Sequence, residues 1–157
     1  MRVGYIGLGA MGGALARHLV GKYTLTVLDL NSAIVASFEA LGARAARSSK
    51  ELARQCDVVL MCLPRSSDVE RVLFGPDGLA EGLAAGAIAV DQTSGIPDET
   101  RGFAQRLAER GVAMMDAPVS GAMATAIAGT VSIIASGPKE VFEKVQPVLA
   151  KIGRAHV

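Results

Sequence analysis

The chain has 157 residues, half of them hydrophobic, with 16 basic and 15 acidic side chains. This length is typical of one domain with a substantial core, and the balanced charge, with two Tyr, four Phe and no Trp, argues against a nucleic-acid partner. No apolar stretch reaches the roughly 20 residues that a membrane helix needs, and glycines stand where a secretory signal has its apolar stretch, so we expect a cytoplasmic protein with no membrane partner.

A glycine-rich stretch near the N-terminus organises the chain. An apolar run over residues 3–6 is followed by Gly7-Leu8-Gly9-Ala10-Met11-Gly12, and apolar residues then recur at helical intervals. This pattern predicts a strand, a tight turn and a helix. In the G-x-G-x-x-G spacing, the first glycine permits the turn, the second lets a pyrophosphate approach the backbone, and the third lets helix and strand pack closely. The six residues therefore predict a dinucleotide site at a helix N-terminus.

Asp29 ends a second apolar run, residues 25–28, about 20 residues beyond the glycine motif. A carboxylate at this position accepts hydrogen bonds from a ribose 2′-hydroxyl and repels a 2′-phosphate. The following residues, Leu30, Asn31 and Ser32, supply no arginine for such a phosphate. We therefore predict that Asp29, Leu30 and Asn31 border the cofactor and that NAD is favoured over NADP.

Strand-like and helix-like segments alternate along the rest of the chain. This alternation predicts a Rossmann-type α/β fold, a doubly wound and mostly parallel sheet with helices on both faces. Further strands are expected at 43–46, 57–63, 88–91, 112–116 and 131–136, and residues 154–157 resemble the start of another. Cys56 and Cys62 lie in or beside an apolar run without neighbouring His ligands, so we interpret them as reduced core residues and predict no metal site.

The loops that follow the strands should line one crevice, because ligands of open parallel sheets bind outside the carboxyl ends of the strands. These loops cover residues 8–11, 29–31, 63–68, 92–95 and 116–122.

Four segments make the chain similar to the β-hydroxyacid dehydrogenase family, which includes the 3-hydroxyisobutyrate and 6-phosphogluconate dehydrogenases. The glycine motif resembles the family's G-L-G-x-M-G, and Cys62-Leu63-Pro64 resembles its loop after the fourth strand. Residues 91–94 resemble its D-x-S-T loop. The most specific match is residues 116–121, Asp-Ala-Pro-Val-Ser-Gly, which resemble its substrate signature D-A-P-V-S-G-G.

The resemblance implies roles for several residues. Leu63 and Pro64 would border the cofactor, Asp68 stands where the family often has Asn, and Ser94 matches a Thr beside the nicotinamide. Ser120, Gly121 and the N–H of Ala122 would hold the substrate carboxylate. Ala122 departs from the family's second Gly, and its methyl group is expected to shrink the pocket or change the backbone angles.

The resemblance also implies a reaction: hydride transfer between the cofactor and a short 3-hydroxy acid, of the 3-hydroxyisobutyrate or tartronate semialdehyde type. The family's catalytic Lys lies in a following helical domain, which also forms much of the homo-oligomer. Residues 1–157 are therefore expected to be the dinucleotide-binding domain alone, with no catalytic residue and little turnover. Two alternatives stay open: a non-catalytic dinucleotide-binding module and an NADPH-dependent imine reductase.

Overall fold

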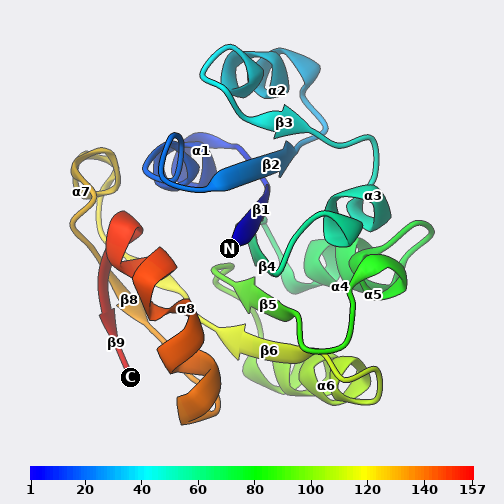
Figure 1. Ribbon diagram of the computed structural model, residues 1–157. Helices are drawn as coiled ribbons and strands as arrows, with labels where there is room; N and C mark the ends of the chain where they lie inside the picture. The colour runs from blue at the N-terminus through cyan, green and yellow to red at the C-terminus, as the bar shows by residue number, and fades with distance from the viewer.

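A six-stranded parallel sheet forms the centre of the computed structural model, which describes residues 1–157. The strand order is β3-β2-β1-β4-β5-β6 (Figure 1). The strands are β1 Arg2–Ile6, β2 Thr24–Leu28, β3 Arg44–Ala45, β4 Val58–Met61, β5 Ile88–Asp91 and β6 Ala113–Asp116. The order reverses between β1 and β4, so the crevice expected for a ligand lies where these two strands end. The predicted doubly wound α/β fold is confirmed.

Helices cover both faces of this sheet and divide the core in two. Helices α1 (Ala10–Arg17), α2 (Ser32–Glu39) and α8 (Lys139–Ile152) bury Leu15, Phe38 and Val148 against one face. The opposite face is covered by α3 (Ser49–Arg54), α4 (Ser66–Phe74), α5 (Leu79–Gly82) and α6 (Pro97–Ala108). Strands buried on both faces are nearly continuous apolar runs, as β4 is here.

A second, three-stranded sheet follows β6, and the sequence pattern did not separate it from the first. It consists of β7 (Val119–Ser120), β8 (Val131–Ile134) and β9 (Gly153–His156) in the order β7-β8-β9. Strand β8 is the predicted strand at 131–136, but it pairs antiparallel with β7 and parallel with β9. Asp116 and Ser136 exchange backbone hydrogen bonds of 3.0 and 2.7 Å, which join the two sheets. Apolar alternation identifies a strand locally but does not say which strand it pairs with.

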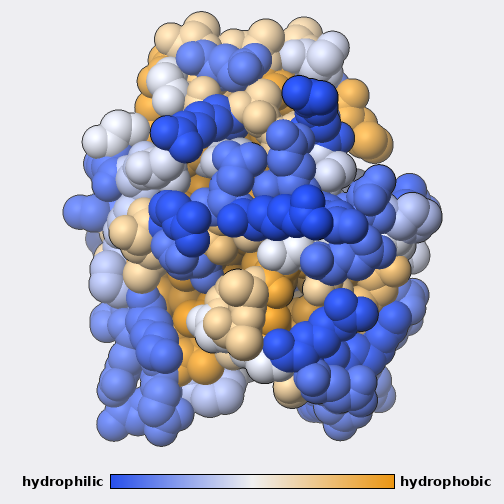
Figure 2. Space-filling model, turned by 45° about the vertical axis from the view of Figure 1, so that its right-hand side comes forward, coloured by the Kyte–Doolittle hydropathy of each residue, from blue (hydrophilic) through white to orange (hydrophobic).

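Figure 2 shows one face of the molecule, on which hydrophilic side chains predominate and hydrophobic ones gather in the lower half between two hydrophilic lobes. None of the helices combines the length and the hydrophobicity that crossing a lipid bilayer requires.

Candidate functional site

The three motif glycines differ in what surrounds them. Gly7 has a φ of +93°, and a Cβ there would overlap the carbonyl oxygen of Cys62. A Cβ on Gly12 would overlap the carbonyl oxygen of Gly7, whereas one on Gly9 would meet nothing within 4 Å. Gly7 and Gly12 therefore allow α1 to pack closely on the ends of β1 and β4, and Gly9 leaves open space above the turn.

Four consecutive backbone N–H groups at the start of α1 have no acceptor. They belong to Gly9, Ala10, Met11 and Gly12, and no side chain caps this helix. Unpaired N–H groups at a helix N-terminus form an anion site. The open space at Gly9 lets a phosphate approach them, so the turn fits the pyrophosphate of a dinucleotide.

Asp29 fastens the glycine-rich turn to the end of β2. Its Oδ2 accepts the Leu8 N–H at 2.7 Å, and its Oδ1 accepts the Asn31 N–H at 2.8 Å. Each carboxylate oxygen has a second acceptor position, so both can still receive a hydroxyl. Asn31 also caps α2, because its Oδ1 accepts from the N–H groups of the following turn at 3.0 and 3.3 Å. Leu30, between them, is fully exposed.

Thr93 joins the loops that follow β4 and β5. Its Oγ1 accepts the Leu63 N–H at 3.0 Å, and its side chain is buried. A second link is the 2.8 Å hydrogen bond from the Ile96 N–H to Ser66 Oγ. Sequence reasoning named Leu63 but missed Thr93 and Ser66. The available signal was that both are small hydroxyl residues soon after strands, Thr93 in a loop and Ser66 at the first position of α4. The neighbouring Pro64 and Ser94, by contrast, are exposed.

Asp68 lies in the first turn of α4 between two arginines. Its carboxylate oxygens are 3.4 Å from Arg65 Nε and 2.7 Å from an Arg71 guanidinium nitrogen. The Asp68 side chain is only 17% exposed, whereas both arginines extend into solvent. The negative charge of Asp68 is thus largely neutralised at the edge of the crevice.

A buried polar pair lies beneath the crevice, and the sequence analysis missed it. The Tyr5 hydroxyl donates to Gln92 Oε1 at 2.6 Å, and both residues are buried. Gln92 Nε2 is buried without a hydrogen-bond partner. This pair connects β1 with the residue after β5, across β4.

Two carboxylates lie side by side where β5 and β6 end. Asp91 and Asp116 are register partners on adjacent parallel strands. Burial raises the pKa of Asp91 to about 6, against which the hydrogen bonds from Thr93 act, and the nearby Asp116 raises it further. Burial also raises the pKa of Asp116.

The Asp91→Asn variant is expected to be more stable than the wild type at pH 7. The folded protein holds a proton on Asp91 that the unfolded chain releases between pH 4 and 6, so the unfolding free energy falls as the pH rises through this window. Removing the charge should recover about 3 kcal/mol at pH 7, while the Oδ1 that accepts the Thr93 N–H remains.

Urea unfolding at pH 4, 5, 6 and 7 measures this difference, with the exposed Glu99→Gln as the control variant. The advantage of Asp91→Asn should grow from pH 4 to pH 7, and the control should show none. A constant difference between the wild type and Asp91→Asn at all four pH values would contradict the prediction.

A second run of unpaired N–H groups begins at Gly121, the last residue of the Asp-Ala-Pro-Val-Ser-Gly segment, and continues into α7. Those of residues 121–124 have no acceptor, and they lie beside the exposed Ser120 hydroxyl at the start of α7 (Met123–Ala128). Gly121 has a φ of +152°, and a Cβ there would overlap Thr125 Oγ1, so this position requires glycine. Ala122 has a φ of −81° and a ψ of 166°, which any residue adopts. Its methyl group therefore does not force the backbone angles of this loop away from ordinary values.

Helix α7 lies beside α1, as Figure 1 shows. His18 Nε2 is 2.8 Å from the Ala126 carbonyl oxygen, and the His18 ring packs against Gly129. His18 therefore has the packing role that half-buried histidines commonly have, and it connects the end of α1 to the segment that follows the substrate signature.

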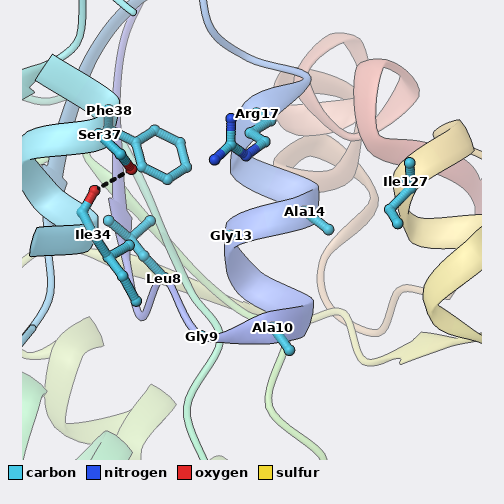
Figure 3. Close-up of a pocket in the computed structure, with 10 residues that line it drawn as sticks. All are labelled: Leu8, Gly9, Ala10, Gly13, Ala14, Arg17, Ile34, Ser37, Phe38 and Ile127. Carbon is cyan, nitrogen blue, oxygen red and sulfur yellow. Dashed lines mark hydrogen bonds between the residues drawn. The ribbon is translucent and has the colours of Figure 1, made fainter. Parts of the chain in front are cut away.

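A cavity of about 320 Å³ lies along α1 (Figure 3). Of the predicted site residues, only Leu8, Gly9 and Ala10 line it. The remaining walls come from the rest of α1, from α2 and from Ile127 of α7, and the Arg17 guanidinium lies 5.4 Å from the centre of the Phe38 ring. The other predicted residues do not line this cavity: Met11 and Gly12 lie in α1, Asp68 in α4 and Ser120 in β7, and the rest lie on loops after strands.

Comparison with known proteins relates this chain to NAD-binding domains of dehydrogenases. A family model described as the NAD binding domain of 6-phosphogluconate dehydrogenase matches residues 2–157. The 2-(hydroxymethyl)glutarate dehydrogenase of Eubacterium barkeri is 40% identical over 98% of this chain and 52% of the relative. The 3-hydroxyisobutyrate dehydrogenase of Pseudomonas aeruginosa is 35% identical over 97% of this chain and 51% of the relative.

A solved dehydrogenase structure has the same fold as this chain. The Mycobacterium tuberculosis 3-hydroxyisobutyrate dehydrogenase with L-serine superposes with a TM-score of 0.91 at 26% identity, over 99% of this chain and 54% of that one. The chain thus spans about half the length of the relatives it matches.

Proposed function

Because this chain belongs to the family of the NAD-binding domain of 6-phosphogluconate dehydrogenase, we propose that it is the cofactor-binding part of an oxidoreductase acting on a short 3-hydroxy acid. The resemblance to the hydroxy-acid dehydrogenases is confirmed by the family match and the relatives. The substrate, the roles of individual residues and the helical domain expected to accompany residues 1–157 belong to the proposal.

The observation that supports this proposed function is that one domain contains two runs of backbone N–H groups without acceptors, at residues 9–12 and 121–124. The first fits a pyrophosphate. The second, with the Ser120 hydroxyl, fits a carboxylate, because successive backbone N–H groups bind anions. Helix α7 has only six residues, so its dipole adds little, and the hydroxyl and loop N–H groups do most of the binding.

Each chain residue in the proposal has a role that its surroundings support. Asp29 accepts ribose hydroxyls, the exposed Leu30 borders the adenosine, and the exposed Ser94 stands beside the nicotinamide. When bound, the dinucleotide supplies the hydride acceptor. The names of both relatives describe hydroxy acids, which supports a carboxylate as the group held at Ser120.

No general acid/base is assigned in this chain. Lys50 pairs with Glu81 at 3.2 Å, and Lys139 lies 3.8 Å from Glu143. No Lys stands in the glycine motif or in any of the loops that follow the main-sheet strands on the crevice side. We therefore propose that residues 1–157 bind the cofactor and carboxylate without turning the substrate over by themselves.

Calorimetric titration of the chain tests this function. We expect NADH to bind at least tenfold more tightly than NADPH, because the Asp29 carboxylate repels a 2′-phosphate. A preference for NADPH would favour the imine reductase alternative.

With NAD⁺ at saturation, Ser120→Ala should weaken 3-hydroxyisobutyrate binding about tenfold, since a hydrogen bond to a charged group is lost. The control Ser49→Ala, on α3, should leave it unchanged. Dinucleotide binding without any carboxylate binding would favour the non-catalytic module.

A further inference from the structure

We propose that Ser120, Ser132 and Arg154 form a row on the second sheet that holds the second carboxylate of a dicarboxylic substrate. The inference rests on the proposed function and narrows it, because it names the substrate class. Arg154 would be a specificity-determining residue, with its guanidinium directed at the carboxylate remote from the reacting carbon.

The strand register puts the three side chains on one face. Ser120 is paired directly with Ser132 across β7 and β8, and Ser132 is paired directly with Arg154 across β8 and β9. Directly paired residues on adjacent strands point to the same face of a sheet. All three are exposed, whereas Val131 and Ile133, which alternate with Ser132, are buried on the other face.

The charge of this face suits an anion. Strands β7, β8 and β9 contain no acidic residue. Arg154 forms no ion pair with any acidic side chain, although seven such pairs occur elsewhere in the chain. The next row on the same face pairs Ile134 with His156 and adds no negative charge. A guanidinium left without a protein partner is available to bind a ligand carboxylate through two parallel hydrogen bonds.

The spacing favours a ligand with two separated carboxylates. Neighbouring strands lie about 4.8 Å apart, so the backbones of Ser120 and Arg154, two strands apart, are separated by roughly 10 Å. The long Arg154 side chain can span part of this distance over Ser132, whose hydroxyl is a further donor. A single carboxylate held at Ser120 does not need Arg154, whereas a four- or five-carbon diacid presents a second carboxylate toward it.

Calorimetric titration of the NAD⁺-saturated chain with glutarate and with valerate, its length-matched monocarboxylate, tests the inference. The wild type should bind glutarate about fivefold more tightly than valerate, as expected for a partly exposed ion pair. Arg154→Gln should abolish this preference while leaving valerate affinity unchanged, and Arg154→Lys should keep part of it. The matched control is Arg44→Gln, which removes an exposed, unpaired arginine from β3.

The outcomes separate the two proposals. Equal affinities for glutarate and valerate in the wild type, or a preference that survives Arg154→Gln, would overturn the subsite while NADH binding and the Ser120→Ala effect still support the proposed function. Failure of the wild type to bind NADH would instead overturn the proposed function itself. Circular dichroism of Arg154→Gln and Arg154→Lys checks that both variants are folded.

Discussion

Gly12→Ala is expected to lower the free energy of unfolding by about 4 kcal/mol. The added Cβ would overlap the Gly7 carbonyl oxygen and lie 3.1 Å from the Cys62 Cβ. Neither neighbour is the flexible end of a long side chain, so α1 must move away from the ends of β1 and β4. In a domain of this size, the loss corresponds to a fall in Tm of about 10 °C. Thermal unfolding followed by circular dichroism measures it.

Gly102→Ala is the matched control, because it makes the same substitution inside α6 at a position where a Cβ meets nothing within 4 Å. Alanine is the better helix former, so Gly102→Ala should raise stability by about 0.5–1 kcal/mol. Gly9→Ala, which also meets no neighbour, should leave Tm nearly unchanged. If Gly12→Ala unfolds at the wild-type temperature, α1 does not depend on the close approach seen here.

The parts of the fold that the sequence predicted are those encoded by local patterns. The glycine spacing, the apolar runs of the six main strands and the position of Asp29 each depend on a few neighbouring residues. They were sufficient to predict the strands of the main sheet, helices on both of its faces and the turn at the start of α1. The NAD-binding assignment, which rested on the same residues, is confirmed by the family match.

The parts that the sequence did not predict depend on contacts between distant segments. The Thr93 hydroxyl accepts an N–H from a residue 30 positions away, and Tyr5 and Gln92 are separated by 87. No periodicity marks such partners. The pairing of β8 with β7 and β9, and therefore the row through Arg154, likewise follows only from the assembled sheet.

The proposed and the observed role of Asp29 illustrate this difference. Sequence spacing predicted a carboxylate directed at a ribose, whereas the structure adds a hydrogen bond in which the Leu8 N–H donates to Asp29 and which shapes the glycine-rich turn. Loss of the Asp29 side chain is therefore expected to weaken cofactor binding both at the ribose and at the glycine-rich turn. Comparing NADH with NADPH separates the two effects, because only NADPH carries a 2′-phosphate.

Asp29→Ala is expected to weaken NADH binding about 100-fold, because charge-assisted hydrogen bonds to the ribose and the fastening of Leu8 are lost together. The affinity for NADPH should fall by no more than about tenfold, since removal of the carboxylate also removes its repulsion of the 2′-phosphate. The ratio of the two dissociation constants should therefore move toward NADPH. Calorimetric titration with both dinucleotides measures the ratio, and thermal unfolding checks that the variant is folded.

Asp57→Asn is the matched control. The Asp57 carboxylate also accepts a backbone N–H, that of Arg2 at 2.8 Å, but it lies just before β4, at the edge of the sheet opposite the crevice. Both dinucleotides should bind Asp57→Asn as they bind the wild type. If Asp29→Ala weakens NADH and NADPH by the same factor, Asp29 acts only by holding Leu8, and the preference for NAD must come from another residue. A shift of the ratio toward NADPH, with the control unchanged, requires that the carboxylate itself lies beside the ribose hydroxyls.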